Sequence, residues 1–176
     1  MDLRNLLFDA RKEHGRLFSM SPTVYIETSV VSYLTARPSR DLIVAGHQQI
    51  TSDWWEQVMP KVDAFVSELV LEEASKGDER AASLRVACIS SIPLLEVVDE
   101  IDDLARKYAR ALNLPEKAEA DAYHMALATW HGIDYLVSWN CTHIASGRVQ
   151  KVVMAVNNAM RFQTPILCTP EELMEV

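Results

Sequence analysis

The sequence contains little cysteine and no internal repeat or low-complexity tract. Its three cysteines, Cys88, Cys141 and Cys168, are an odd number without C-x-x-C spacing, which argues against a disulfide framework and a zinc site. We therefore expect three reduced, buried thiols. Because 49% of the residues are hydrophobic and 24% are charged, the composition also argues against a disordered or collagen-like chain and allows a sizeable core.

Long apolar runs are absent as well. Charged residues such as Asp63, Glu68 and Asp134 interrupt the most apolar segments, so none reaches the roughly 20 uncharged residues that span a membrane. Residues 1–16 mix acidic and basic side chains and contain no apolar stretch of signal-peptide length. These absences predict a cytoplasmic protein with no membrane partner.

Positive charge is scarce relative to negative charge. The chain has 17 Lys and Arg against 25 Asp and Glu, which gives a formal net charge of -8 and a pI of about 5.1. This balance argues against a protein that holds long nucleic acid by charge alone. It does not exclude a nuclease, because carboxylates gathered around a metal ion add negative charge to the free protein.

Strand-like and helical segments alternate along the chain after an N-terminal extension, residues 1–19. Apolar, β-rich runs predict strands at 23–27, 62–66, 91–97, 134–139 and 164–168. Helical patterns occupy 30–34, 41–58, 69–77, 78–90, 99–112, 115–132, 147–162 and 169–176. The alternation predicts one α/β domain, residues 20–176, in which helices cover both faces of a mostly parallel, twisted sheet.

Polar residues at the carboxyl ends of the predicted strands are the first candidates for chemistry, because open α/β sheets bind ligands there. Glu27 ends the first strand, and Thr28 and Ser29 follow it as residues suited to capping the next helix. The N–H groups at a helix start favour an anion. Glu27 is therefore a candidate site residue; the alternative is that it simply marks where the strand meets water.

Two adjacent glutamates follow the second predicted strand. Residues four apart share a face of a helix, so Glu72 can form a surface ion pair with Lys76. Glu73 instead lies on the face of Leu69 and would point to the apolar side. Glu73 is thus the functional candidate, and the alternative is a boundary residue whose carboxylate reaches water.

Asp121 lies in the most apolar helical segment of the chain. Pro115 is expected in the first turn of the helix at 115–132, which places Asp121 about two turns inside. An unpaired buried carboxylate costs several kcal/mol, so Asp121 needs a cationic partner or a shared proton. That cation is either a buried Lys or Arg or a metal ion.

Asn140 and His143 follow the strand predicted at 134–139. Alone, such an Asn is commonly a turn residue and such a His a hydrogen-bonded structural residue. Together they mark another strand-end position beside the three acids. Oxygen donors with no cysteine and little histidine suit Mg²⁺ or Mn²⁺ rather than zinc, and these ions promote phosphodiester hydrolysis.

Four segments resemble, in order, spacing and expected element, the motifs of PIN-domain proteins. They are YIETS at 25–29, SELVLEEASKGD at 67–78, ADAYHMALA at 120–128 and LVSWNCTHI at 136–144. The resemblance implies a three-layer α/β/α fold. Because many members are VapC-type toxins of bacterial toxin–antitoxin pairs, it also implies a Mg²⁺- or Mn²⁺-dependent endoribonuclease that acts on RNA, forms a homodimer and binds an antitoxin protein.

The resemblance assigns roles by position. The family's acids fall on Glu27, Glu73 and Asp121, which are expected to hold the metal ion directly or through water. Its fourth position falls on Asn140, which would help to fix a water or a phosphate oxygen.

Small polar residues beside these positions are expected to contact the substrate. Thr28 and Ser138 match the family's small hydroxyl positions. His143 completes a Trp-Asn-x-x-His variant that resembles a subgroup of the family, and it would contact a phosphate or assist the leaving group.

The sequence departs from the family pattern at two positions. The first position is usually Asp rather than Glu27, which is one methylene longer but can still ligate a metal ion, and the neutral Asn140 replaces an acid that is common at the fourth position. Asn140 and the acidic surface support an alternative function: a catalytically weak or inactive PIN fold that acts as an interaction or RNA-binding module. A phosphohydrolase on another doubly wound fold is less favoured, because no Asp-x-Asp pair follows the first predicted strand.

Overall fold

A computed structural model of the chain describes residues 21–175, so the predicted extension at 1–19 lies outside the described residues. The strands are β1 (Thr23–Ile26), β2 (Asp63–Ser67), β3 (Leu94–Leu95), β4 (Tyr135–Val137) and β5 (Ile166–Cys168). The α-helices are α2 (Thr28–Thr35), α3 (Leu42–Gln57), α4 (Glu68–Ala74), α5 (Glu79–Ile89), α6 (Asp99–Leu112), α7 (Glu119–Trp130) and α8 (Gly147–Met160). Short 3₁₀ helices are η1 (Met59–Lys61), η2 (Glu116–Ala118) and η3 (Glu171–Leu173).

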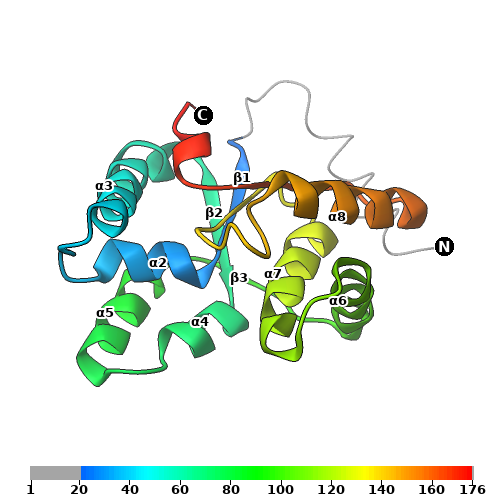
Figure 1. Cartoon of the computed structure of the whole chain (residues 1–176), viewed down its shortest axis with the longest axis horizontal. Coiled ribbons are helices and arrows are strands. Elements are labelled where there is room, and N and C mark those ends of the chain that lie inside the picture. The colour runs from blue at the N-terminus through cyan, green and yellow to red at the C-terminus, as the bar shows by residue number, and fades with distance from the viewer. Residues whose placement is uncertain (1–20, 176) are drawn as a thin grey trace.

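All five strands run parallel in one sheet, in the order β3-β2-β1-β4-β5. Helices α2 to α5 lie on one side of the sheet and α6 to α8 on the other (Figure 1). The predicted α/β class, with helices on both faces of a parallel sheet, is confirmed. Since β1 is central, the carboxyl ends of β2 and β4 flank its own carboxyl end.

The central strand is apolar because both of its faces are covered. Val24, Tyr25 and Ile26 are completely buried, as a strand between two helical layers requires. Ile26 is paired with Val137 of β4, and the N–H of Glu27 donates to the carbonyl of Val137 at 3.1 Å. This register carries Glu27 to the end of β1 beside the end of β4.

The structure differs from the predicted elements in three places. Only Leu94–Leu95 of the strand predicted at 91–97 pairs with β2. The segment at 115–132 is not one helix, because Ala118 leaves helical geometry (φ -111°, ψ 14°) between η2 and α7. At the C-terminus, the predicted helix at 169–176 is reduced to η3 within the described residues. Local apolar pattern sets the type of element but not its exact ends.

The three cysteines are free, as expected, but they are not all buried. Cys168 is buried, Cys88 is partly buried and Cys141 is exposed, so the prediction of buried thiols is wrong for Cys141. Burial raises the pKa of Cys168 to about 12. Within residues 21–175, no helix is both long and apolar enough to cross a membrane.

Candidate active site

The carboxylate of Glu27 is nearly buried, and its hydrogen-bond partners are hydroxyl groups. Glu27 is 7% exposed, and its Oε2 accepts hydrogen bonds from Ser29 Oγ and, at 2.7 Å, from Ser138 Oγ. The Ser29 hydroxyl also accepts a bond from the N–H of Trp139 at 2.8 Å. Within residues 21–175, no Lys or Arg forms an ion pair with Glu27. A nearly buried carboxylate with hydroxyl partners alone is a favourable place for a cation.

Glu73 faces the same region from α4. Its side chain is 25% exposed, and its Oε2 accepts from Thr28 Oγ1 at 2.5 Å and lies 3.1 Å from His124 Nε2. Burial raises the pKa of Glu73, but the contact with His124 and the hydrogen bond from Thr28 outweigh burial and hold it below the ordinary value. The neighbouring Glu72 is exposed and pairs with Lys76 at 2.9 Å, which confirms the predicted division of the two glutamates.

Thr28 and Ser29 do not cap α2, contrary to the expectation from sequence. The N-cap residue of α2 is Glu27, and no side chain caps the helix there. The hydroxyls of Thr28 and Ser29 instead donate to Glu73 and Glu27. A carboxylate accepts a stronger hydrogen bond than a neutral group does, so both hydroxyls are held by the site rather than by the helix end.

His124 brings a nitrogen into this group of acids. The residue is 1% exposed, and its Nδ1 lies 2.8 Å from the hydroxyl of Tyr25. That hydroxyl is 2.7 Å from Ser67 Oγ, which is the N-cap of α4. A buried chain of polar groups therefore runs from Ser67 through Tyr25 and His124 to Glu73.

Asp121 lies in the first turn of α7, not two turns inside a longer helix, because α7 begins at Glu119. Its side chain is nevertheless only 15% exposed. Asn140 Nδ2 donates to Oδ1 at 2.9 Å, and His143 Nδ1 lies 2.9 Å from Oδ2. Burial raises the pKa of Asp121, and the hydrogen bonds from His143 and Asn140 only partly oppose this.

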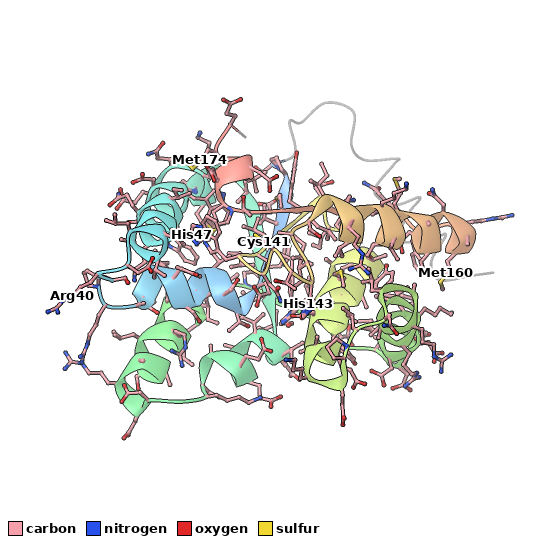
Figure 2. The ribbon with its side chains drawn as sticks, viewed as in Figure 1. Arg40, His47, Cys141, His143, Met160 and Met174 are labelled. Carbon is pink, nitrogen blue, oxygen red and sulfur yellow. The ribbon has the colours of Figure 1, made fainter. Side chains whose placement is uncertain are left out.

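The loop between β4 and α8 supplies the partners of Asp121. Figure 2 shows His143 beside α7, near the centre of the molecule, with Cys141 in the same loop. The Oδ1 of Asn140 accepts from the backbone N–H of His143 at 3.1 Å, and the backbone N–H of Asn140 donates to Ser138 Oγ at 2.9 Å. Asn140 thus fixes the loop as well as Asp121.

The donor set fits a divalent cation. Ligand atoms of Glu27, Glu73 and His124 all lie within 4.8 Å of one another, a spacing that one ion can bridge. Asp121 is not a member of this group, so its expected role as a metal ligand stays a prediction, as do the substrate contacts expected of Thr28, Ser138 and His143.

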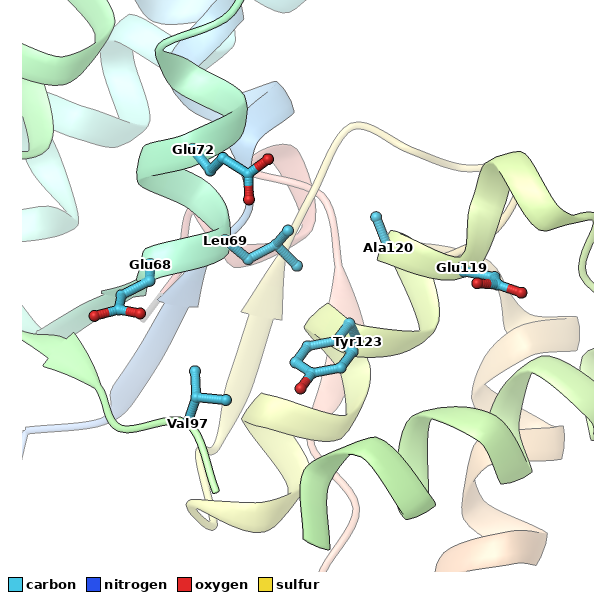
Figure 3. A pocket seen from close by; sticks show the side chains of 7 residues that line it. All are labelled: Glu68, Leu69, Glu72, Val97, Glu119, Ala120 and Tyr123. Carbon is cyan, nitrogen blue, oxygen red and sulfur yellow. The ribbon is translucent and has the colours of Figure 1, made fainter. Parts of the chain in front are cut away.

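A surface pocket lies between α4 and α7 (Figure 3), and its lining does not include Glu27, Glu73 or Asp121. Its lining comes from α4, α7 and the segment after β3: Glu68, Leu69, Glu72, Val97, Glu119, Ala120 and Tyr123. Carboxylates on both sides of this pocket repel phosphate groups. An RNA strand is therefore not expected to run through it.

Comparison with known proteins gives a structural relative. No family model matches the sequence, and no curated protein sequence matches it significantly. Among solved structures, VapC20 of Mycobacterium tuberculosis, described as a toxin that cleaves the sarcin-ricin loop, matches with a TM-score of 0.53. The chain has a PIN-like fold. The match covers 68% of this chain and 92% of VapC20 at 17% sequence identity, so it confirms the architecture that the four motifs implied.

The PIN-like fold gathers residues that sequence reasoning missed: Tyr25, Ser29, Ser67 and His124. One signal was available, because His124 is three residues after Asp121 and shares its face of the helix. Tyr25 likewise shares a strand face with Glu27 by the two-residue alternation of a strand. Neither spacing shows that the His124 ring meets Glu73, since that contact joins α7 to α4.

Proposed function

We propose that this protein is a Mg²⁺- or Mn²⁺-dependent endoribonuclease that hydrolyses RNA phosphodiester bonds. One observation carries the proposal: the nearly buried Glu27 carboxylate forms no ion pair with a Lys or Arg within residues 21–175, while the ligand atoms of Glu73 and His124 lie within 4.8 Å of its own. Two carboxylates this close repel each other, and a divalent cation relieves the repulsion. The shared fold with VapC20, a toxin described as cleaving the sarcin-ricin loop, supports RNA as the substrate class.

In this proposal the acidic side chains bind the cation and the hydroxyl side chains position an acid. Glu27 and Glu73 hold the cation, with Asp121 as a further ligand, directly or through water. When bound, the ion activates a water for in-line attack and neutralises charge on the phosphate. Ser29 and Ser138 fix the Glu27 carboxylate, and both have hydroxyls within hydrogen-bond reach of it.

The other side of the proposed site orients substrate. Asn140 and His143 hold the carboxylate of Asp121 in one position, at 2.9 Å each. In this proposal His143 also contacts a phosphate oxygen, which its 28% exposed side chain allows. Asn140 contributes no charge, so affinity for the cation is expected to be lower than with an acid at this position.

The proposal extends to partners. We propose that the protein is the toxin of a type II toxin–antitoxin pair and that it acts as a homodimer. The acidic pocket beside the site, with Leu69 and Val97 in its lining, has the charge and apolar surface to receive a basic, partly apolar segment of an antitoxin.

Cleavage of a mixed panel of structured and single-stranded RNAs tests the proposed activity. Purified protein is assayed with Mn²⁺, with EDTA, and as the Asp121→Asn variant. We expect cleavage that requires the metal and falls at least about a hundredfold in Asp121→Asn. Glu72→Gln is the matched control, because Glu72 is an exposed carboxylate next to the site whose partner is Lys76.

The opposite result would favour the interaction-module alternative. If folded wild type and Asp121→Asn are equally inert on the whole panel, the nuclease proposal fails. Cleavage that persists in EDTA would instead contradict the metal dependence.

A further inference from the structure

His124 is the one imidazole that meets the carboxylates of Glu27 and Glu73 within the described residues. We propose that His124 Nε2 is a direct ligand of the divalent cation, held in place by Tyr25, and that this nitrogen gives the site a preference for Mn²⁺ over Mg²⁺. The proposal rests on the proposed metal-dependent function and adds the composition of its ligand set.

The orientation of the His124 ring is fixed by the Tyr25 hydroxyl, which contacts Nδ1 on the side away from the acids. A metal-bound histidine almost always donates its other ring N–H to a hydrogen-bond acceptor, which sets the tautomer and the ring angle. Here Nδ1 already faces the Tyr25 hydroxyl at 2.8 Å, and that hydroxyl faces Ser67 Oγ at 2.7 Å. Burial raises the pKa of Tyr25, so the phenol keeps its proton and serves as a neutral partner.

The front of the ring faces the acids. Nε2 lies 3.1 Å from Glu73 Oε2, within hydrogen-bond distance. For Nε2 to offer its lone pair to a cation, the proton of the neutral ring would have to be on Nδ1, from which it would be donated to the Tyr25 oxygen. The polar chain can reverse its direction because both hydroxyls donate and accept. This tautomer of the ring is neutral, and only the hydroxyl hydrogens of Tyr25 and Ser67 would turn with it.

A purely structural role leaves this arrangement poorly explained. Burial of the His124 imidazole next to two carboxylates costs free energy, because a polar group is removed from water. An apolar side chain of similar volume would fill the same space at a lower cost in free energy. Mg²⁺ binds oxygen ligands almost exclusively, whereas Mn²⁺ also favours carboxylate and water but belongs to the first-row transition series, whose members accept an imidazole nitrogen. The single nitrogen in an otherwise oxygen-lined site therefore points to Mn²⁺ as the better-bound of the two proposed ions.

Electron spin echo spectroscopy of Mn²⁺ bound to the full-length protein tests the assignment, because it detects ¹⁴N nuclei bonded to the ion. We expect an imidazole nitrogen signal in wild type that disappears in His124→Gln. Two controls, His143→Gln and Glu72→Gln, should retain the signal, since neither side chain belongs to the Glu27, Glu73 and His124 group.

A second variant covers the case in which His124→Gln does not fold. Tyr25→Phe keeps the imidazole and removes the hydroxyl behind it, so we expect the nitrogen signal to remain while Mn²⁺ affinity falls about 10-fold or more. Calorimetric titration of both ions should also show wild type binding Mn²⁺ more tightly than Mg²⁺, and Tyr25→Phe losing part of that difference.

The outcomes separate this proposal from the proposed nuclease function. Stoichiometric Mn²⁺ binding without a nitrogen signal overturns the ligand assignment and leaves His124 as a positioning residue for Glu73, even if RNA is cleaved. A nitrogen signal without RNA cleavage supports the ligand assignment while the nuclease function fails. Absence of Mn²⁺ binding overturns both.

Discussion

Glu73 and Asp121 are carboxylates of one site whose pKa values move in opposite directions. Both are partly withdrawn from water, which raises a carboxyl pKa. Glu73 has a hydroxyl at 2.5 Å and an imidazole at 3.1 Å on the same oxygen, and these favour its ionised form enough to reverse the effect. Asp121 has an imidazole and a neutral amide, and for it burial dominates. Ionised Glu73 therefore stabilises the metal-free fold, whereas ionised Asp121 opposes it.

Neutralising each acid should change stability with opposite sign. In urea unfolding at pH 7 without metal, we expect Glu73→Gln to lose about 1–2 kcal/mol, the usual value of hydrogen bonds to a charged group. Asp121→Asn should gain on the order of 1 kcal/mol, because it removes a carboxylate whose ionised form is disfavoured by burial. Glu72→Gln should stay within about 0.5 kcal/mol, since its ion pair with Lys76 is exposed.

The pH dependence follows from the two shifts. A lowered pKa means that the contribution of Glu73 is complete above its ordinary value of 4.5 and is lost as the pH falls through its folded-state pKa. A raised pKa means that the penalty of Asp121 is absent below its ordinary value of 3.8 and grows as the pH rises through its folded-state pKa. Equal signs for the two variants at pH 7 would contradict this account.

At the scale of single residues, the sequence separates Glu73 from Glu72 because a helix repeats every 3.6 residues and one face must be apolar. The β-rich run at 134–139 likewise places Asn140 at a strand end. Such reasoning does not reach the contact of His124 with Glu73, because these residues are 51 positions apart and meet only in the folded chain, where a side chain of α7 reaches one of α4. Local periodicity carries no information about such a meeting.

At the scale of elements, the first turn of α2 connects the strand end to two acids. Thr28 and Ser29 extend from consecutive positions of that turn, and each hydroxyl donates to a different carboxylate. Helix α2 therefore lacks a side-chain cap, and the two hydroxyls that could have provided one donate hydrogen bonds to the site instead. A lost cap costs about 1 kcal/mol, and charge-assisted bonds are worth at least as much.

Substitution of Thr28 tests the role of this turn. Thr28→Val keeps the shape and β-branching but removes the hydroxyl, so Glu73 loses the 2.5 Å contact. We expect RNA cleavage to fall about 10- to 100-fold, the rate equivalent of a charge-assisted hydrogen bond. Thr28→Ser is the matched control and should retain most activity. If Thr28→Val and Thr28→Ser are equally active, the hydroxyl does not position Glu73.

The helix at 115–132 shows where element prediction fails. Its apolar pattern is continuous, and Pro115 suits a helix start, so the sequence predicts a single helix. In the structure, η2 precedes α7, and Asp121 falls in the first turn of α7. Helix α7 makes the most extensive helix contact of the described residues with α6, and the sequence pattern does not contain this contact.

At the scale of the whole molecule, the parallel sheet follows from the alternation of strands and helices, but the strand order does not. Placement of β1 between β2 and β4 decides that Glu27 lies centrally among the strand ends. The site then draws on the end of β1, on α4 and on α7, and therefore joins helices from both sides of the sheet (Figure 1). A ligand bound there contacts both helical layers at once.

Cation binding should consequently raise the stability of the whole fold. An ion that binds only the native state at 100 times its dissociation constant adds about 2.7 kcal/mol, which corresponds to a rise of roughly 5–10 °C in Tm for a chain of this size. Thermal unfolding with Mn²⁺ and with EDTA measures this rise, which Glu72→Gln should preserve and Glu73→Gln should abolish. A full rise in Glu73→Gln would place the ion elsewhere on this acidic protein. If Tm rises with Mn²⁺ only in variants that retain Glu73, the ion binds at the strand-end acids and stabilises both helical layers. This is the result expected from the central position of β1.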